Sequence, residues 1–212
     1  IDPTQIESAI TEKTTAILAT HVFGVPCDVE SIERIAKKHH LKVIYDAAHC
    51  FGTKINGSSI LNYGDLSTLS LHATKLMHSV EGGAIFVNDS SNKLEGLTEP
   101  VSPLRYTVNR LRNFGHFGPE VFDGVGINAK NSEIHAAIGL VNLRYAEEII
   151  ADRERQHDRY NQGLAALTLI KPEIAENIDW NKSYYPVVFK GEEETLYVLD
   201  GLEASGIYAR RY

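Results

Sequence analysis

Cysteine and positive charge are both scarce in this sequence. Only two cysteines, Cys27 and Cys50, occur among 212 residues, which excludes a disulfide framework and a CxxC metal pair. Lysine and arginine number 21 against 28 aspartates and glutamates, so the formal net charge is −7. Without a basic stripe, nucleic acid is not expected as the main partner. The two thiols predict a reduced, cytoplasmic setting, and no metal site is expected.

Long apolar runs are also missing. No stretch approaches the roughly 18 consecutive apolar residues of a membrane span, and no signal peptide is visible, so no membrane contact is expected. The composition, 43% hydrophobic and 23% charged, is ordinary for a soluble globular protein. The chain begins with Ile1 rather than methionine and stops after the segment YARRY. We therefore expect it to be a piece of a longer protein.

Strands and helices alternate in the first half of the chain. Apolar segments, several of them rich in β-branched residues, predict strands at 14–21, 41–49, 66–71 and 82–88. The first strand is expected to be buried on both faces. Asp2-Pro3 should open a short helix at 3–10, and a second helix is predicted at 29–40. This order predicts the α/β class, with a mostly parallel sheet and flanking helices.

The second half of the chain has a different pattern. Residues 131–164 predict one long helix, with Asn131 or Ser132 as its N-cap. A strand at 183–189 and a helix at 195–207 should follow it and begin a smaller α/β domain. We accordingly predict a large domain over residues 1–150 and an incomplete small domain over residues 151–212.

Polar residues lie where the predicted strands end, and ligands of open α/β sheets bind at such ends. His21 follows the first strand and Asp46 the second, while Ser70 ends the third, five residues before Lys75. Each residue taken alone has a simpler explanation. His21 could be a core histidine, and Asp46 could be a helix N-cap. Ser70 could be a structural serine, and Lys75 could be a solvated loop lysine.

Taken together, these residues fit one chemistry. A lysine amine can form a Schiff base with an aldehyde cofactor, and a carboxylate at a strand end can keep a pyridinium nitrogen protonated. This pair is typical of enzymes that use pyridoxal phosphate (PLP). A hydroxyl such as that of Ser70 can bind the cofactor phosphate, and Gly82 and Gly83 let the backbone pass close by. The sequence therefore predicts PLP as cofactor, held by Lys75.

A series of motifs begins at Tyr45. The chain reads YDAAHCFG, then GDLSTLS, then the lysine and EGG. This order resembles the DegT/StrS-type sugar aminotransferases, PLP enzymes of fold type I, whose pattern is Asp-Ala-Ala-Gln/His-x-x-Gly, Gly-Asp, a Ser-Phe strand, the lysine and Glu-Gly-Gly. The segments HVFGVPCD and GINAKNSEIHAAIG are similar to two further elements of that family. The resemblance covers residues 1–212 and implies the large domain of that fold with part of its small domain.

The resemblance also implies roles for individual residues. Lys75 would be the catalytic lysine that holds PLP, and Asp46 would be the partner of the pyridinium nitrogen. His49 stands where the family usually has glutamine, near the 3-hydroxyl of the cofactor. Ser70 would bind the phosphate. Asn128 would reach the phosphate site of a neighbouring subunit, which implies a homodimer.

The implied reaction is transamination from an amino-acid donor, expected to be L-glutamate, to a nucleotide-linked keto-deoxysugar. The segment SLHATKLMHSVEGG most resembles the branch that aminates nucleotide-linked 4-keto-6-deoxyhexoses, so a dTDP-linked sugar of this type is the expected substrate. Histidine at position 49 also occurs in a dehydratase branch, but that branch replaces the lysine. A non-catalytic regulatory homologue is the other alternative. The family's Gly-Thr phosphate-binding turn and stacking aromatic residue are missing here, so we expect its N-terminal part to be absent.

Overall fold

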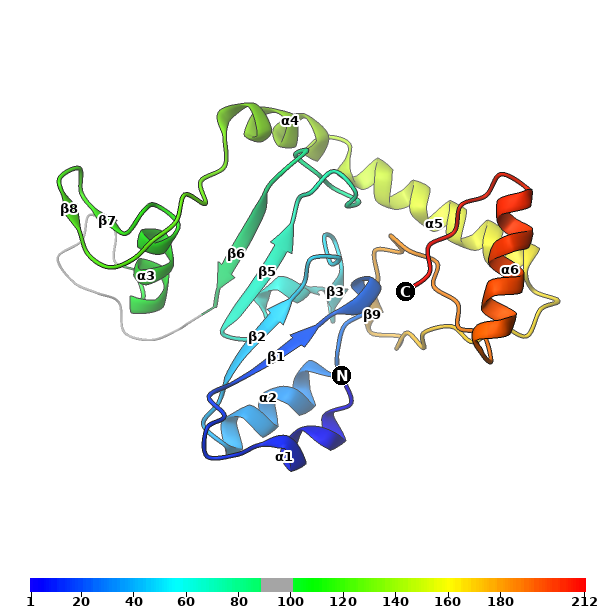
Figure 1. The fold of residues 1–212 in the computed structure, drawn as a ribbon, viewed down its shortest axis with the longest axis horizontal. Helices are drawn as coiled ribbons and strands as arrows, with labels where there is room; N and C mark the ends of the chain where they lie inside the picture. Colours follow the sequence, from blue (N-terminus) through cyan, green and yellow to red (C-terminus); the bar gives the residue numbers. More distant parts are fainter. Residues whose placement is uncertain (89–100) are drawn as a thin grey trace.

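A four-stranded sheet lies at the centre of the fold (Figure 1). The computed structural model describes residues 1–88 and 101–212. The sheet has the order β1-β2-β5-β6. Its members are β1 (Ala16–Thr20), β2 (Lys42–Asp46), β5 (Leu66–Ser70) and β6 (Gly83–Val87). The first three strands are parallel, and β6 is antiparallel to β5 at the edge. The predicted α/β class and mostly parallel sheet are therefore confirmed.

The helices that precede β1 and β2 cover one face of this sheet. Asp2 caps the 3-10 turn η1 (Pro3–Gln5) by accepting a hydrogen bond from the backbone of Thr4, and α1 (Ile6–Ala9) follows. Asp28 caps α2 (Val29–Lys38) in the same way. The core between these helices and the sheet is built from apolar side chains, among them Ile6, Ile17, Ala19, Val29, Ile32, Ala36, Val43 and Tyr45.

The other face of the sheet is more open in the part of the chain that the structure describes. Side chains alternate between the two faces of a strand. Ile17 and Ala19 of β1 are buried, whereas Leu18 between them is 67% exposed. Ile85 of β6 is 52% exposed. The expectation that the first strand is buried on both faces was therefore wrong for the described residues, because α1 and α2 pack on one face only.

A second, smaller sheet connects the loop after β2 with the C-terminal part of the chain. Its central strand β3 (Lys54–Ile55) pairs antiparallel with β4 (Ser58–Ser59) and with β9 (Ile178–Asp179). The 3-10 turn η3 (Ile60–Asn62) then leads towards β5. Pairing with β9 brings residues that follow position 179 beside the loop that contains His49.

Residues 102–130 form a lobe beside the sheet. It contains α3 (Pro103–Leu111) and the hairpin of β7 (His116–Phe117) and β8 (Val121–Phe122). Arg110 joins the helix to the hairpin, because its guanidinium pairs with Asp123 at 2.7 Å. The same guanidinium lies 5.2 Å from the centre of the Tyr106 ring.

The segment predicted as one long helix consists of two helices. These are α4 (Glu133–Leu143), capped by Ser132, and α5 (Ala146–Gly163). Tyr145 interrupts the helix with φ −102° and ψ 3°, and its N–H donates to the carbonyl of Asn142, three residues back. The prediction of a single helix was wrong. Helix α5 runs through the predicted boundary at residue 150, and the division into two domains stays a prediction.

The predicted strand at 183–189 is also wrong. These residues are irregular apart from an isolated bridge between Ile170 and Val188, and Pro186 lacks the N–H that a ladder requires. Helix α6 (Glu192–Ala204) confirms the helix predicted near the end of the chain. None of the helices in the described residues has both the length and the apolar composition needed to cross a membrane.

Candidate active site

The carboxyl ends of three parallel strands meet at one edge of the sheet. Thr20 of β1 is in register with Asp46 of β2, which is in register with Thr68 of β5. Ser70 lies two residues further along β5. The backbone N–H of His21 donates to the carbonyl of Asp46 at 3.0 Å. The structure therefore brings together three strand ends that the sequence marked with polar residues.

Asp46 ends β2 in a tight turn. Its Oδ1 accepts a hydrogen bond from the backbone N–H of Ala48 at 3.0 Å, and residues 47–53 form turns rather than a helix. The alternative interpretation of Asp46 as a helix N-cap was therefore wrong. Its second oxygen, Oδ2, has no hydrogen-bond partner among the described residues. It can therefore accept a hydrogen bond from an N–H group of a ligand.

His21 is a core histidine. Its side chain is fully buried, stacks on Tyr45 with ring centres 4.5 Å apart, and accepts a hydrogen bond from the backbone of Cys27 at Nδ1. Burial lowers the pKa of His21 to about 4, although the Asp46 carboxylate opposes that shift. The ring is therefore neutral at physiological pH and belongs to the packing beneath the site.

His49 and Lys75 line one pocket. Their neighbours there come from the loop after β2, the lysine loop, helix α5 and the segment after β9; they are Ala48, Phe51, Thr74, Leu76, Arg153, Ser183 and Tyr184. Burial lowers the pKa of His49, the positive charge of Lys75 lowers it further, and the Asp46 carboxylate raises it. Lys75 and Asp46 thus both lie close enough to His49 to affect its protonation.

The segment after β9 holds the loops of this site together. Asn181 is 2% exposed and donates from Nδ2 to the carbonyls of His49 (2.7 Å) and Phe51 (2.9 Å). Trp180 donates from Nε1 to the carbonyl of Phe23 at 3.0 Å. Position 24, which lies between these segments, requires glycine. A Cβ on Gly24 would lie 2.7 Å from the His49 carbonyl, and its φ is +77°.

Two of the lining residues that sequence reasoning missed come from distant parts of the chain. Tyr184 packs against the His49 ring with centres 4.9 Å apart, and Arg153 of α5 contributes a guanidinium to the pocket. Both lie more than 70 residues from Lys75 in the sequence. No local pattern identifies them, since β3–β9 pairing and the path of α5 place them.

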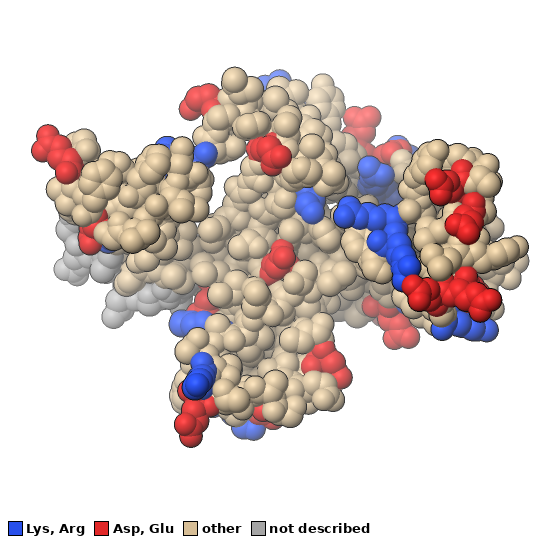
Figure 2. Space-filling model, viewed as in Figure 1, with Lys and Arg blue, Asp and Glu red and all other residues tan. Residues whose placement is uncertain are grey.

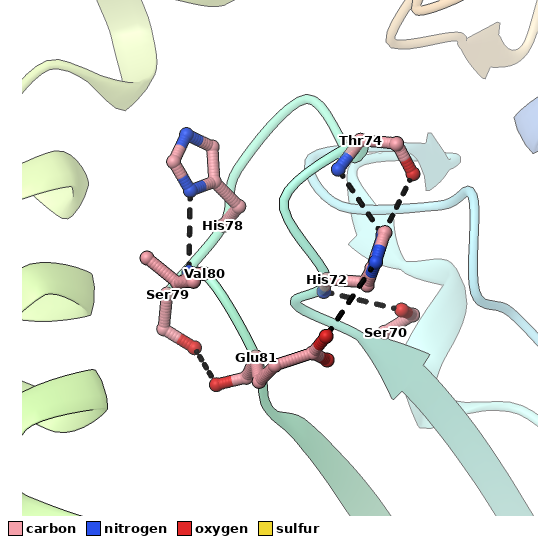
Figure 3. A network of polar contacts seen from close by, with 7 residues as sticks. All are labelled: Ser70, His72, Thr74, His78, Ser79, Val80 and Glu81. Atoms are coloured by element: carbon pink, nitrogen blue, oxygen red, sulfur yellow. Dashed lines mark hydrogen bonds and ion pairs between the residues drawn. The ribbon is translucent and has the colours of Figure 1, made fainter.

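Lys75 lies in the loop that joins β5 to β6, and this loop has its own polar network (Figure 3). Nδ1 of His72 accepts from the backbone N–H of Thr74 at 3.2 Å and lies 3.0 Å from its hydroxyl. Nε2 of His72 lies 3.6 Å from the Glu81 carboxylate on the other limb of the loop. The backbone of His72 donates to Ser70 Oγ at 3.3 Å, and the Ser70 hydroxyl donates no hydrogen bond to any other described residue.

The glycine pair that ends this loop allows close packing. A Cβ on Gly82 would lie 2.5 Å from Ser79 Oγ, and its φ is +157°. A Cβ on Gly83 would lie 2.8 Å from the Leu69 carbonyl on the neighbouring strand. The EGG motif is thus explained by the return of the chain into β6.

Asn128 lies apart from this pocket. It forms an isolated bridge with Asn113 in the 102–130 lobe, and its Oδ1 accepts a hydrogen bond from Lys130 Nζ at 2.6 Å. It is exposed, and it is not among the residues that line the Lys75 pocket. Of the predicted site residues, His49 and Lys75 line this pocket, whereas Asp46 and Ser70 lie at the strand ends beside it and do not line it. The role of Asn128 at a neighbouring subunit stays a prediction.

The residues at this sheet edge fit PLP. The Schiff base needs an amine that faces a pocket, and Lys75 supplies it. The ring nitrogen needs a carboxylate with a free oxygen, which Asp46 Oδ2 provides. The phosphate needs a donor, and the Ser70 hydroxyl at the adjacent strand end can donate, because it has no acceptor among the described residues.

Comparison with known proteins identifies the family. A model of the DegT/DnrJ/EryC1/StrS aminotransferase family matches residues 1–212. The chain belongs to this family. Its aminotransferases depend on PLP, and the sequence-based family and cofactor predictions are thereby confirmed.

Two curated relatives and one solved structure illustrate the match. The dTDP-4-amino-4,6-dideoxy-D-glucose transaminase of Shigella dysenteriae is 38% identical over 98% of this chain and 54% of its own length. The protein of the same name from Escherichia coli is 36% identical over 100% of this chain and 55% of its own length. The structure of DesI with its TDP-sugar product superposes with a TM-score of 0.84, at 31% identity, over 99% of this chain and 52% of DesI.

This chain thus spans about half the length of the curated relatives that it matches. The fold-type I architecture is confirmed over that half. The remaining half of each relative contains segments with no counterpart in residues 1–212, so activity, substrate and partners are assigned only to the full-length protein.

Proposed function

We propose that the full-length protein is a PLP-dependent transaminase that transfers an amino group from L-glutamate to a nucleotide-linked keto-deoxysugar. The observation that carries this proposal is the convergence of Lys75, His49 and Asp46 at the carboxyl end of the sheet. The names of the Shigella dysenteriae and Escherichia coli relatives support a dTDP-4-keto-6-deoxyhexose as the acceptor. The TDP-sugar product bound to DesI supports the same class.

Each of the candidate site residues has a separate role in this proposal. PLP, when bound, supplies an electron sink for negative charge that develops at the substrate carbon. Lys75 would hold the cofactor and, when its amine is free, would accept and return a proton at Nζ. Asp46 Oδ2 would keep the ring nitrogen protonated. The Ser70 hydroxyl would bind the phosphate, and His49, whose ring packs against Tyr184, would lie near the cofactor.

Positive charge near the pocket suits an anionic substrate. Figure 2 shows Lys and Arg side chains gathered on one face between the sheet and the C-terminal helix α6, while most of that face is uncharged. Arg153 lines the Lys75 pocket itself, and a guanidinium binds carboxylates and phosphates well. The donor carboxylate and the nucleotide diphosphate are both ligands of this kind. Both cysteines are free, which agrees with a reaction in the cytoplasm.

A half-reaction separates this function from its alternatives. Incubating the PLP-loaded full-length protein with L-glutamate alone should release about one equivalent of 2-oxoglutarate per site, because the amino group stays on the cofactor until an acceptor arrives. A non-catalytic homologue would release none, and a sugar dehydratase would return a sugar that carries no new nitrogen. The matched control is D-glutamate, which carries the same charges in the wrong configuration. A subsequent screen of nucleotide-linked keto sugars, read by mass spectrometry of the amino sugar, identifies the acceptor.

We also propose that the protein is a homodimer whose sites are shared between subunits. The 102–130 lobe exposes a run of apolar side chains around Asn128; they are Phe117 (51%), Val121 (52%), Phe122 (67%), Val125 (88%) and Ile127 (66%). A patch of this kind marks a protein interface. Closed two-fold symmetry is the commonest arrangement, and an obligate interface buries roughly 2,000 Å² or more.

Mixing two inactive full-length variants, Lys75→Ala and Asn128→Asp, tests the shared site. In a mixed dimer one site carries both defects and the other carries neither, provided that Asn128 acts on the partner's cofactor. Activity should recover to roughly one quarter of the wild-type level when subunits exchange at random. Mass spectrometry under native conditions verifies the exchange. If mixed dimers form without any recovery, Asn128 acts within its own chain or not at all.

A further inference from the structure

The loop that carries Lys75 is closed at its base by backbone hydrogen bonds. Leu71 donates to the carbonyl of Gly82 at 2.9 Å, and Ser79 donates to the carbonyl of Leu71 at 2.9 Å. The Ser79 hydroxyl donates to the carbonyl of Glu81 at 2.8 Å, as Figure 3 shows. These bonds fix the two limbs of the loop against each other. They do not fix the loop against the rest of the protein.

Helix α4 supplies that second attachment. Asn142 donates from Nδ2 to the carbonyl of His78 at 2.9 Å, across 64 positions of sequence. Gly139, one turn earlier, lets the helix approach closely, because a Cβ there would lie 3.1 Å from Ser79 Cβ. Residues three apart share one face of a helix. Gly139 and Asn142 therefore form a single docking face for His78 and Ser79.

The docked part of the loop is held in an unfavourable backbone conformation. Val80 has φ +67°, which is costly for a β-branched residue, and its N–H donates to the ring Nδ1 of His78 at 3.3 Å. Such conformations persist when the surrounding contacts over-determine them. Ser79 is only 1% exposed and Met77 only 4%. Neither side chain can therefore move far without displacing its neighbours.

We propose that Asn142 is a positioning residue for the reaction, which fixes the loop of Lys75 to helix α4 and so sets where the lysine amine lies. The proposal rests on the proposed role of Lys75. Lys75 lies three residues before His78, and its backbone donates to the carbonyl of His72 at 2.9 Å. A displacement at His78 is therefore transmitted through a short, internally bonded turn to Lys75. Asn142 itself is not among the residues that line the Lys75 pocket.

The experiment compares the full-length protein with Asn142→Leu, which keeps the size of the side chain and removes the donor. Hydrogen–deuterium exchange in the cofactor-free protein should be about tenfold faster for the peptide 71–82, the size expected for one lost hydrogen bond. In the loaded enzyme kcat for the glutamate half-reaction should fall about tenfold, while KM for glutamate stays within about twofold. Asn142→Gln retains an amide donor and should recover part of both effects.

Gln162→Leu is the matched control, since it removes a carboxamide from an exposed position of α5 and should change neither measurement. If Asn142→Leu does not fold, Asn142→Asp replaces it. Wild-type exchange in peptide 71–82 would overturn the proposal, and so would faster exchange with unchanged kcat, which would leave Asn142 a purely structural role. Failure of the proposed function looks different, because the wild-type protein would then release no 2-oxoglutarate.

Discussion

Replacing Lys75 by alanine in the full-length protein is expected to abolish transamination. Lys75 lines the pocket with His49, and alanine has no amine to hold PLP or to move a proton. Loss of one positioned acid–base group alone costs about 10²–10⁴-fold, and here the covalent attachment is lost as well. We expect a loss of at least about 10⁴-fold in kcat, measured as 2-oxoglutarate release. The visible absorption of lysine-bound PLP should disappear too.

The control for this variant is Lys37→Ala. Lys37 is exposed on α2 and pairs with Glu33, four residues earlier, so its removal should cost little. Lys75→Arg adds a second test, because it keeps the positive charge beside His49 but cannot form a Schiff base with PLP. Activity near the wild-type level in Lys75→Arg would show that charge alone is needed, and the assignment of Lys75 would fail.

The central sheet and the site motif could be predicted because their determinants are local. Short apolar strands and turn residues fixed β1, β2, β5 and β6 to within a few residues. Parallel pairing then places the carboxyl ends of β1, β2 and β5 together. Asp46 and Ser70 were predicted as site residues in this way, whereas the role predicted for Lys75 rests on the resemblance of the surrounding motifs to the family.

Features that depend on distant contacts could not be predicted. The break at Tyr145 has no glycine or proline to mark it, although the composition changes there from the mainly apolar α4 to the mainly charged α5. The burial of β1 on one face depends on which segments pack against it, which its own composition does not reveal. Asn181 looks like an ordinary polar loop residue until β9 pairs with β3 and brings it under the carbonyls of His49 and Phe51.

The lysine loop shows the same division on a smaller scale. Its motif predicts the chemistry of Lys75, whereas its contacts with Asn142 and Gly139 involve a helix that follows more than 50 residues later. A side-chain amide and a missing Cβ leave no periodic signal. The predicted role of Lys75 therefore comes from a local motif, whereas the contacts between its loop and α4 are visible only in the structure.

Replacing Asp46 by asparagine in the full-length protein is expected to slow both half-reactions by about 10²–10⁴-fold, the usual worth of a group that controls proton transfer. The fold should survive, because asparagine has the same shape and its carbonyl oxygen can still accept the hydrogen bond from Ala48 at 3.0 Å. What changes is the group at the Oδ2 position. A carboxylate favours a protonated ring nitrogen beside it, whereas an amide carries no charge, so the ring becomes a poorer electron sink.

Three measurements separate this explanation from general damage to the site. Thermal unfolding of Asp46→Asn should remain close to that of the wild type, and PLP should still be retained through Lys75. The rate of 2-oxoglutarate release should nevertheless fall. Asp28→Asn is the matched control, because Asp28 caps α2 at the surface and asparagine is an equally good N-cap residue. Near-normal half-reaction rates in a folded, PLP-loaded Asp46→Asn protein would contradict the role of this carboxylate, since the amide cannot hold the ring nitrogen in its protonated form.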